Sequence, residues 1–220
     1  MPFEIYCDFD GTITTRDAFD YLLECLAHSD WKAIEEQWER GEISARQCMG
    51  RQVALIGHPW SKIVDTLQAV PIDPTFAPFA KWCTESGIKL YVVSDGPDKA
   101  IEHMLNREGV RVDSIIANHL AEDDQGRFAL EFPYGENDCP AGVCKCKVLE
   151  RAGNKVTRVV IGDGQSDFCW AKGADVVFAK KKLLDYCRKE GIAHLEFVNF
   201  DSIRLTLESK MGSACGLSGK

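Results

Sequence analysis

Short apolar runs alternate along the chain with segments whose apolar residues recur at helical spacing. The runs at residues 3–7, 88–94, 113–118, 156–162 and 174–179 predict strands of the core, and the run at 88–94 is β-branched in character. Helical spacing predicts helices between them, at residues 76–86, 97–107, 144–152 and 167–172. This alternation predicts an α/β fold, a doubly wound parallel sheet with helices on both faces.

One long segment interrupts the alternation. Residues 17–70 are largely helical in pattern. We therefore expect a small helical cap at residues 15–71, inserted after the first strand into a core made of residues 1–14 and 72–210. The small and polar residues 211–220 are predicted to form a disordered tail.

The charge balance narrows the choice of partners. The 220 residues include 26 basic and 34 acidic side chains, for a net charge of −8. This field disfavours nucleic acids and anionic membranes as partners, but it leaves room for a small anionic substrate in a locally positive pocket. No apolar run reaches the ~18 residues of a membrane span, and the N-terminus lacks the features of a signal peptide. We expect a cytoplasmic protein.

Ten cysteines are scattered along the chain. In a chain of this length they favour reduced, packed thiols over a disulfide scaffold. Three of them, Cys139, Cys144 and Cys146, are close in sequence and could bind zinc with a distant fourth ligand such as His119. Their spacing lacks paired C-x2-C knuckles, so packing thiols are favoured over this alternative.

Polar residues that could carry chemistry follow several of the predicted strands. The segments are DFDGT at residues 8–12, SDG at 94–96 and GDGQSD at 162–167, with a lysine, Lys145 or Lys147, at the start of a helix. Open α/β sheets bind ligands at the carboxyl ends of their strands. The four segments are therefore expected to meet at one edge of the sheet.

Two carboxylates, Asp8 and Asp10, lie two positions apart at the first strand end. They repel each other unless a cation or a proton lies between them. The alternative without a function is a solvated acidic turn. An EF-hand calcium loop is excluded, because Thr12 and Ile13 stand where that loop needs an acidic or amide ligand and a glycine. We interpret Asp8 as a nucleophile that forms an aspartyl-phosphate and Asp10 as the general acid and base.

Further residues of these segments suit a magnesium ion and a phosphate group. Asp8 and Asp163 could bind the metal together with a backbone carbonyl, and Asp167 could support them or cap a helix. Backbone N–H groups near Gly96 and the Ser94 hydroxyl would bind phosphate oxygens. Lys145 or Lys147 would neutralise the charge on phosphate and nucleophile.

Together these segments resemble the motifs of the haloacid dehalogenase superfamily of phosphatases, over about residues 3–180. The resemblance implies a Rossmann-like core, Asp8 as nucleophile and Asp10 as acid and base. It also implies magnesium bound by Asp8, Asp163 and the Asp10 carbonyl, with Asp167 in support. The run KCKVLER is similar to the segment of the phosphoserine-phosphatase subfamily in which the first lysine, here Lys145, is catalytic.

The substrate class is suggested by weaker similarities. GRQVALI, at residues 50–56, resembles the cap helix of the phosphoserine-phosphatase subfamily and would place Arg51 at the substrate. Asp17 stands where those enzymes carry a glutamate for the substrate amine. CPAGVCKCKVLE and the segments FAKKKLLDYCRKEGIAHLEF and NFDSIR resemble the methionine-salvage phosphatases that act on 2-hydroxy-3-keto-5-methylthiopentenyl-1-phosphate.

We therefore expect a magnesium-dependent phosphatase for a small phosphorylated metabolite, with the methionine-salvage compound preferred to phosphoserine. Asp17 and Arg51 are the predicted specificity residues. Two other classes remain as alternatives: a non-catalytic protein that binds a phosphometabolite, and an interaction module stabilised by zinc. An intact set of Asp8, Asp10, Lys145 and Asp163 argues against the first of these.

Overall fold

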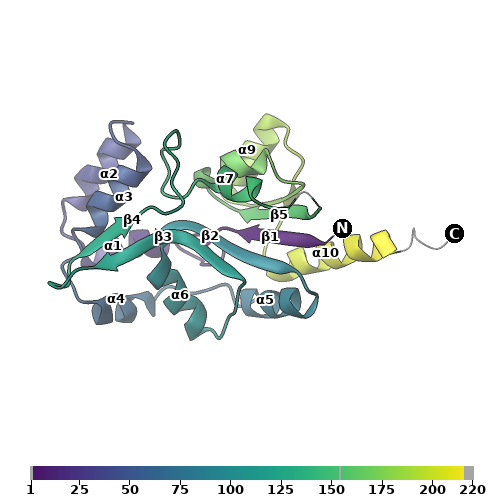
Figure 1. Ribbon diagram of the computed structural model, residues 1–220, viewed down its shortest axis with the longest axis horizontal. Helices are drawn as coiled ribbons and strands as arrows, with labels where there is room; N and C mark the ends of the chain where they lie inside the picture. The colour runs from purple at the N-terminus through teal and green to yellow at the C-terminus, as the bar shows by residue number, and fades with distance from the viewer. Residues whose placement is uncertain (1, 154, 216–220) are drawn as a thin grey trace.

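The computed structural model describes residues 2–153 and 155–215, and its strands form one central sheet (Figure 1). The seven strands lie in the order β4-β3-β2-β1-β5-β6-β7. All neighbours are parallel except the antiparallel pair β3 and β4. The strands are β1 Phe3–Cys7, β2 Lys89–Pro97, β3 Ser114–Glu122, β4 Phe128–Glu131, β5 Thr157–Gly162, β6 Val176–Ala179 and β7 Leu195–Glu196.

Helices connect the parallel strands and cover the sheet. They are α1 Ala18–Leu26, α2 Trp31–Glu39, α3 Ala45–Val53, α4 Trp60–Leu67, α5 Phe76–Glu85, α6 Asp98–Arg107, α7 Lys145–Glu150, the 3-10 helix η1 Gln165–Asp167, α8 Phe168–Ala171, α9 Lys181–Glu190 and α10 Phe200–Cys215. In Figure 1, α5, α6 and α10 lie on one side of the sheet, and α7 and α9 lie on the other.

Alternating side chains of the strands divide the core between these two faces. Ile5 and Cys7 of β1 belong to the apolar cluster that includes the buried side chains of α5, α6 and α10. Tyr6, between them, packs in a second cluster with residues of α7 and α8. A period of two is what a strand buried on both faces requires. The predicted doubly wound sheet with helices on both faces is confirmed.

The second strand runs further than its sequence pattern indicated. We expected a strand at residues 88–94 that turns directly into a helix, but β2 continues to Pro97. Its pairing with β3 is irregular between Val93 and Pro97. Ser94 and Gly96 therefore lie in a distorted strand end, and the helix begins at Asp98. The sequence Asp123-Asp124-Gln125-Gly126 has the composition of a turn, and these residues close the antiparallel hairpin of β3 and β4.

The segment between β1 and α5 contains four helices, α1 to α4. The third begins at a capping box in which Ser44 and Gln47 exchange hydrogen bonds between side chain and backbone. Buried residues of α1 and α4, such as Leu22 and Leu67, belong to the same apolar cluster as Ile5 of the sheet. This segment thus shares its core with the sheet, and its treatment as a separate cap at residues 15–71 stays a prediction.

Helix α10 is the last element of the chain that the structure describes. Phe200 at its start packs against Phe76 of α5, with 4.8 Å between the ring centroids. The helix continues to Cys215, so residues 211–215 are helical in the structure and the disorder predicted from residue 211 does not begin there. Residues 216–220 lie outside the described residues.

Candidate active site

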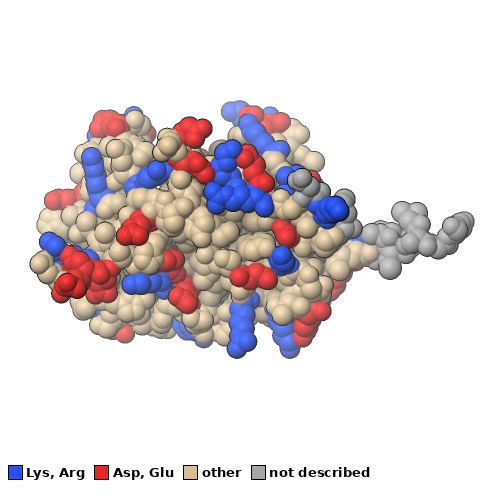
Figure 2. All heavy atoms as spheres, viewed as in Figure 1, with Lys and Arg blue, Asp and Glu red and all other residues tan. Residues whose placement is uncertain are grey.

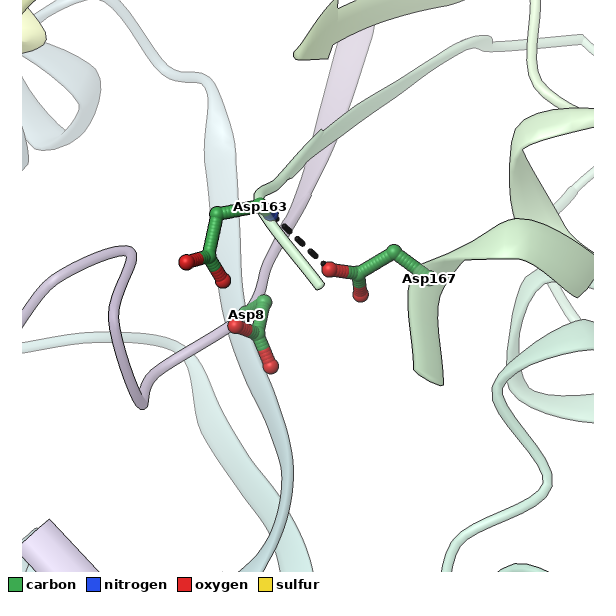
Figure 3. A group of neighbouring side chains, drawn as sticks. All are labelled: Asp8, Asp163 and Asp167. Carbon is green, nitrogen blue, oxygen red and sulfur yellow. Dashed lines mark hydrogen bonds between the residues drawn. The ribbon is translucent and has the colours of Figure 1, made fainter. Parts of the chain in front are cut away.

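Three buried carboxylates meet at the carboxyl edge of the sheet. Because β1 and β5 are parallel neighbours, Asp8 and Asp163, which follow them, emerge at the same edge. Asp167 joins them from η1, and one carboxylate oxygen of each residue lies within 4.8 Å of the others. Figure 3 shows the three side chains together, with the Asp163 amide donating to Asp167. Asp8 is 5% exposed, Asp163 8% and Asp167 0%.

Lys145, the first residue of α7, joins two of these carboxylates. Its Nζ lies 2.6 Å from Oδ1 of Asp8 and 2.8 Å from Oδ1 of Asp167. The side chain is 1% exposed. Lys147 instead points to the surface, where it pairs with Glu150 at 2.7 Å. Of the two lysines left open by the sequence, Lys145 is the one in contact with Asp8.

Burial and mutual charge shift the ionisation of this pair. Burial raises the pKa of Asp8 to about 8, the Asp167 carboxylate acts in the same direction, and Lys145 opposes them. Burial alone would lower the pKa of Lys145. The carboxylates of Asp167 and Asp8 outweigh that effect and hold the lysine pKa above its ordinary value. The lysine therefore stays charged, whereas Asp8 in the metal-free chain holds its proton up to about pH 8.

Asp10 lies beside the strand end that contains Ser94 and Gly96. The amide of Ala18 donates to Oδ1 of Asp10 at 2.8 Å, and the Ser94 hydroxyl donates to Oδ2 at 3.3 Å. The Gly96 amide in turn donates to Oγ of Ser94 at 2.9 Å. Burial raises the pKa of Asp10 well above its ordinary range, and the Asp17 carboxylate adds to this shift. A carboxyl group that holds its proton can act as a general acid.

Asp167 supports the turn that carries Asp163. Its Oδ2 accepts hydrogen bonds from the amides of Asp163 and Gly164, both at 3.0 Å. The sequence left open that the Asp167 side chain caps a helix. In the structure this side chain makes no capping hydrogen bond to α8, because it binds the preceding turn. The hydroxyl of Thr12 donates to Oδ1 of Asp163 at 3.2 Å. These contacts fix both aspartates before any ligand binds.

Gly11 allows the first motif to approach Asp163 closely. Its φ is +72°, a value that glycine adopts readily. A Cβ atom at this position would lie 2.5 Å from Oδ2 of Asp163. The sequence DFDGT therefore needs glycine at position 11 for both backbone and packing reasons.

The two predicted specificity residues have different surroundings. Asp17 caps α1 by accepting the Asp20 amide at 2.8 Å. Asp17 is exposed at the surface, but the surrounding protein partly desolvates its carboxyl and raises its pKa. Asp163 contributes to the same shift, so Asp17 lies within the field of the site. Arg51 is exposed on α3 and donates to Oε1 of Gln37 on α2 at 3.2 Å. Its contact is thus with the helical segment and not with the aspartates.

Two lysines near the site were not singled out from the sequence. Lys180 donates to the carbonyl of Thr12 at 3.2 Å, and Lys181 lies 2.8 Å from Oδ2 of Asp163. Both follow β6, whose carboxyl end lies at the same edge as those of β1 and β5. The run of three lysines directly after a predicted strand was the available signal.

Arg46 is a further residue that the sequence did not indicate. From α3 it makes four hydrogen bonds to carbonyl groups of Glu136, Cys139 and Ala141, at 2.8–3.2 Å. These carbonyls belong to the loop that leads into α7 and Lys145. Arg46 therefore connects the helical segment to the lysine side of the site.

The chemistry of the donors suits a hard divalent cation. Among the residues that the structure describes, Asp8, Asp163 and Asp167 are the one group of three or more His, Cys, Asp or Glu ligands that lie within 4.8 Å of one another. Cys139, Cys144 and Cys146 do not form such a group, and His119 pairs with Asp98 at 2.8 Å. The zinc alternative therefore has no four-ligand site in the described structure.

The surface carries both signs of charge. On the face drawn in Figure 2, lysine and arginine side chains are interspersed with aspartate and glutamate. Within the described residues, no helix combines the length and the apolar character needed to cross a membrane.

Comparison with known proteins identifies the family of the chain. The model of the haloacid dehalogenase-like hydrolase family matches residues 5–172. A 2-hydroxy-3-keto-5-methylthiopentenyl-1-phosphate phosphatase of Brevibacillus brevis is 32% identical over 211 residues, which are 91% of this chain and 93% of that protein. The bifunctional enzyme MtnB/MtnX of Bacillus licheniformis is also 32% identical, over 93% of this chain, but the chain spans only 49% of that protein.

The fold has a close counterpart among solved structures. A substrate-bound phosphoserine phosphatase matches with a TM-score of 0.70 and 21% identity, over 94% of this chain and 98% of that one. At this identity the match supports the fold alone. The family match, the similar phosphatases and the buried site together show that the chain belongs to the haloacid dehalogenase-like hydrolases and is a phosphatase of that family.

Proposed function

We propose that the chain is a magnesium-dependent phosphomonoesterase that hydrolyses a small phosphorylated metabolite through an aspartyl-phosphate on Asp8. The observation that carries this proposal is the contact of Asp8 with Lys145, at 2.6 Å, within a buried group of three carboxylates. A buried carboxylate beside a fixed ammonium group and a cation site is suited to attack phosphorus.

Asp8 and Asp10 divide the chemistry between them. An oxygen of Asp8 attacks phosphorus, the bond from phosphorus to the substrate oxygen breaks, and Asp10 gives its proton to the leaving oxygen. Asp10 then takes a proton from water, which attacks phosphorus, and the bond between phosphorus and Asp8 breaks. The raised pKa of Asp10 suits the first of these proton transfers.

Magnesium would be held by Asp8, Asp163 and the Asp10 carbonyl, with Asp167 in support. When bound, the ion would neutralise phosphate charge and favour an in-line geometry. The fit rests on the donors: three buried carboxylates whose oxygens lie within 4.8 Å of one another, which is the ligand type that magnesium prefers. Lys145, the Ser94 hydroxyl and the Gly96 amide are suited to bind the remaining phosphate oxygens.

For the substrate we propose 2-hydroxy-3-keto-5-methylthiopentenyl-1-phosphate. The support is the 32% identity, over most of both chains, to a phosphatase named for this compound. Phosphoserine is the second candidate, because Asp17 lies in the field of Asp10 and Asp163 and could bind a substrate ammonium group. A non-catalytic binding protein is the third, and the intact Asp8, Asp10 and Lys145 set argues against it.

The deciding experiment compares the two phosphate esters with purified protein and magnesium. We expect phosphate release from both esters. We expect kcat/KM to be at least about a hundredfold higher for the sulfur compound, since a phosphatase named for that compound is similar to this chain over most of its length. A preference for phosphoserine would favour the second candidate. If the protein binds a phosphorylated metabolite but releases phosphate neither from these esters nor from a generic phosphomonoester, the third candidate, a non-catalytic binding protein, is favoured.

A further inference from the structure

Lys181 contacts the candidate metal site from a part of the chain outside the sequence motifs. Its Nζ lies 2.8 Å from Oδ2 of Asp163 and 3.0 Å from the carbonyl oxygen of Gly11. The Asp163 side chain is 11% exposed, whereas that of Lys181 is 54% exposed. The ammonium group therefore reaches a nearly buried carboxylate from the solvent side.

The backbone of Lys181 is strained in a way that glycine would avoid. Its φ is +48°, and within residues 2–153 and 155–215 it is the one residue other than glycine with a positive φ. An L-residue pays a steric cost in this region, and such strain gathers at functional positions. Backbone hydrogen bonds hold the segment, from Lys180 to the Gly162 carbonyl and from Leu183 to the Asp163 carbonyl. A lysine in a backbone conformation that favours glycine indicates that the contacts of its side chain with Asp163 and Gly11 have a function.

Two ammonium groups bind the three carboxylates of the site, and they differ in their exposure to solvent. Lys145 binds Asp8 and Asp167 and is 1% exposed, so it cannot leave without opening the core. Of the three carboxylates, Lys181 binds only Asp163, and its long side chain is half exposed to water. If a divalent cation binds to the Asp163 carboxylate, it has to displace the ammonium group of Lys181 from that carboxylate.

We propose that Lys181 is the displaceable counter-ion of the metal site: it neutralises Asp163 in the metal-free chain and weakens magnesium binding by competing for that carboxylate. This inference rests on the proposed function, which includes the metal site. Because the competing charge is partly exposed, we expect a modest effect that falls as salt increases.

Calorimetric titration with magnesium tests the inference without any turnover. The variants are Lys181→Met, which removes the charge at similar length, and Lys181→Arg, which retains it. Lys182→Met is the matched control, because Lys182 is an exposed neighbour on the same helix. At low ionic strength we expect Lys181→Met to bind magnesium roughly three- to tenfold more tightly than wild type. Lys181→Arg and Lys182→Met should stay within about twofold of it.

Folding of each variant is checked by circular dichroism. Lys181→Gly provides a second charge-free variant that also relieves the positive φ, and it should show the same tighter binding. If wild type binds magnesium and both charge-free variants bind it equally or more weakly, the inference is overturned and the metal site stands. If wild type binds no magnesium, the proposed metal site fails, and the inference fails with it.

Discussion

The ammonium nitrogen of Lys145 lies 2.6 Å from Oδ1 of Asp8, although the two residues are 137 positions apart in the chain. Both side chains are almost completely buried, and Asp167 binds the same ammonium group. A charge in such a place is stable only while its partners remain. The contact therefore links the chemistry of the site to the stability of the fold.

Replacing Lys145 by methionine should destabilise the protein and abolish turnover. The substitution leaves Asp8 and Asp167 buried without their cation, and breaking a buried pair in this way costs about 3 kcal/mol. Unfolding in denaturant and phosphate release measure the two effects. Lys147→Met is the control: its exposed pair with Glu150 should contribute to neither. Equal losses in both variants would mean that Lys145 has no special role.

Asp8→Asn should remove phosphatase activity while the fold remains. The amide has nearly the same volume but is not a nucleophile, so we expect a loss of at least about a thousandfold in kcat. The melting temperature should change little near neutral pH, since the amide is neutral like the protonated carboxyl that it replaces, and Lys145 keeps its contact with Asp167. Residual activity within about tenfold of wild type would contradict the covalent mechanism.

The metal-free protein should lose stability as the pH rises from about 5 to about 8. Burial raises the pKa of Asp8 to about 8, so the folded chain holds a proton there that the unfolded chain releases near pH 4. Where the folded state binds more protons, the free energy of unfolding falls with increasing pH, here by up to about 1 kcal/mol per pH unit. Chemical unfolding in a chelator at several pH values measures this slope. Asp8→Asn should make the slope shallower without abolishing it, because burial also raises the pKa of Asp10 and of Asp17. An equally steep slope in that variant would assign it to those other groups.

Asp17→Asn should distinguish the two candidate substrates. The change removes a charge from the field of Asp10 and Asp163 but retains hydrogen-bonding capacity. It should lower kcat/KM for phosphoserine by at least about tenfold, because the ammonium group loses a charge-assisted contact. For the sulfur compound, which has no ammonium group, we expect a change of less than about threefold. Equal effects on both esters would mean that Asp17 does not contact the organic part of the substrate.

Arg46→Met should loosen the loop that precedes Lys145. Four hydrogen bonds from the guanidinium group to the carbonyls of Glu136, Cys139 and Ala141 would be lost. We expect destabilisation of about 2 kcal/mol and faster proteolytic cleavage between residues 136 and 144. Arg40→Met removes an exposed arginine paired with Glu42 and should leave cleavage unchanged. Unaltered cleavage in Arg46→Met would show that other contacts hold the loop.

The sequence by itself determined the fold class and the edge at which the site lies. The short runs around Ile5 and Val160 have the length and the apolar character of strands buried on both faces, and this property is local to each run. Since parallel strands present their carboxyl ends at one edge, Asp8 and Asp163 had to emerge close together once the sheet was predicted. The family motifs added Lys145 as the preferred lysine.

The tertiary structure decided which side chains actually meet. The contacts of Lys145 with Asp8 and of Arg46 with the Glu136 carbonyl join residues 137 and 90 positions apart. The contact of Lys181 with Asp163 joins residues 18 positions apart, which follow two neighbouring strands. Such contacts depend on loop paths and on how helices pack against the sheet, and no local period encodes either. The same reason explains why β2 could run on to Pro97: the pairing with β3, more than local propensity, fixes where that strand ends.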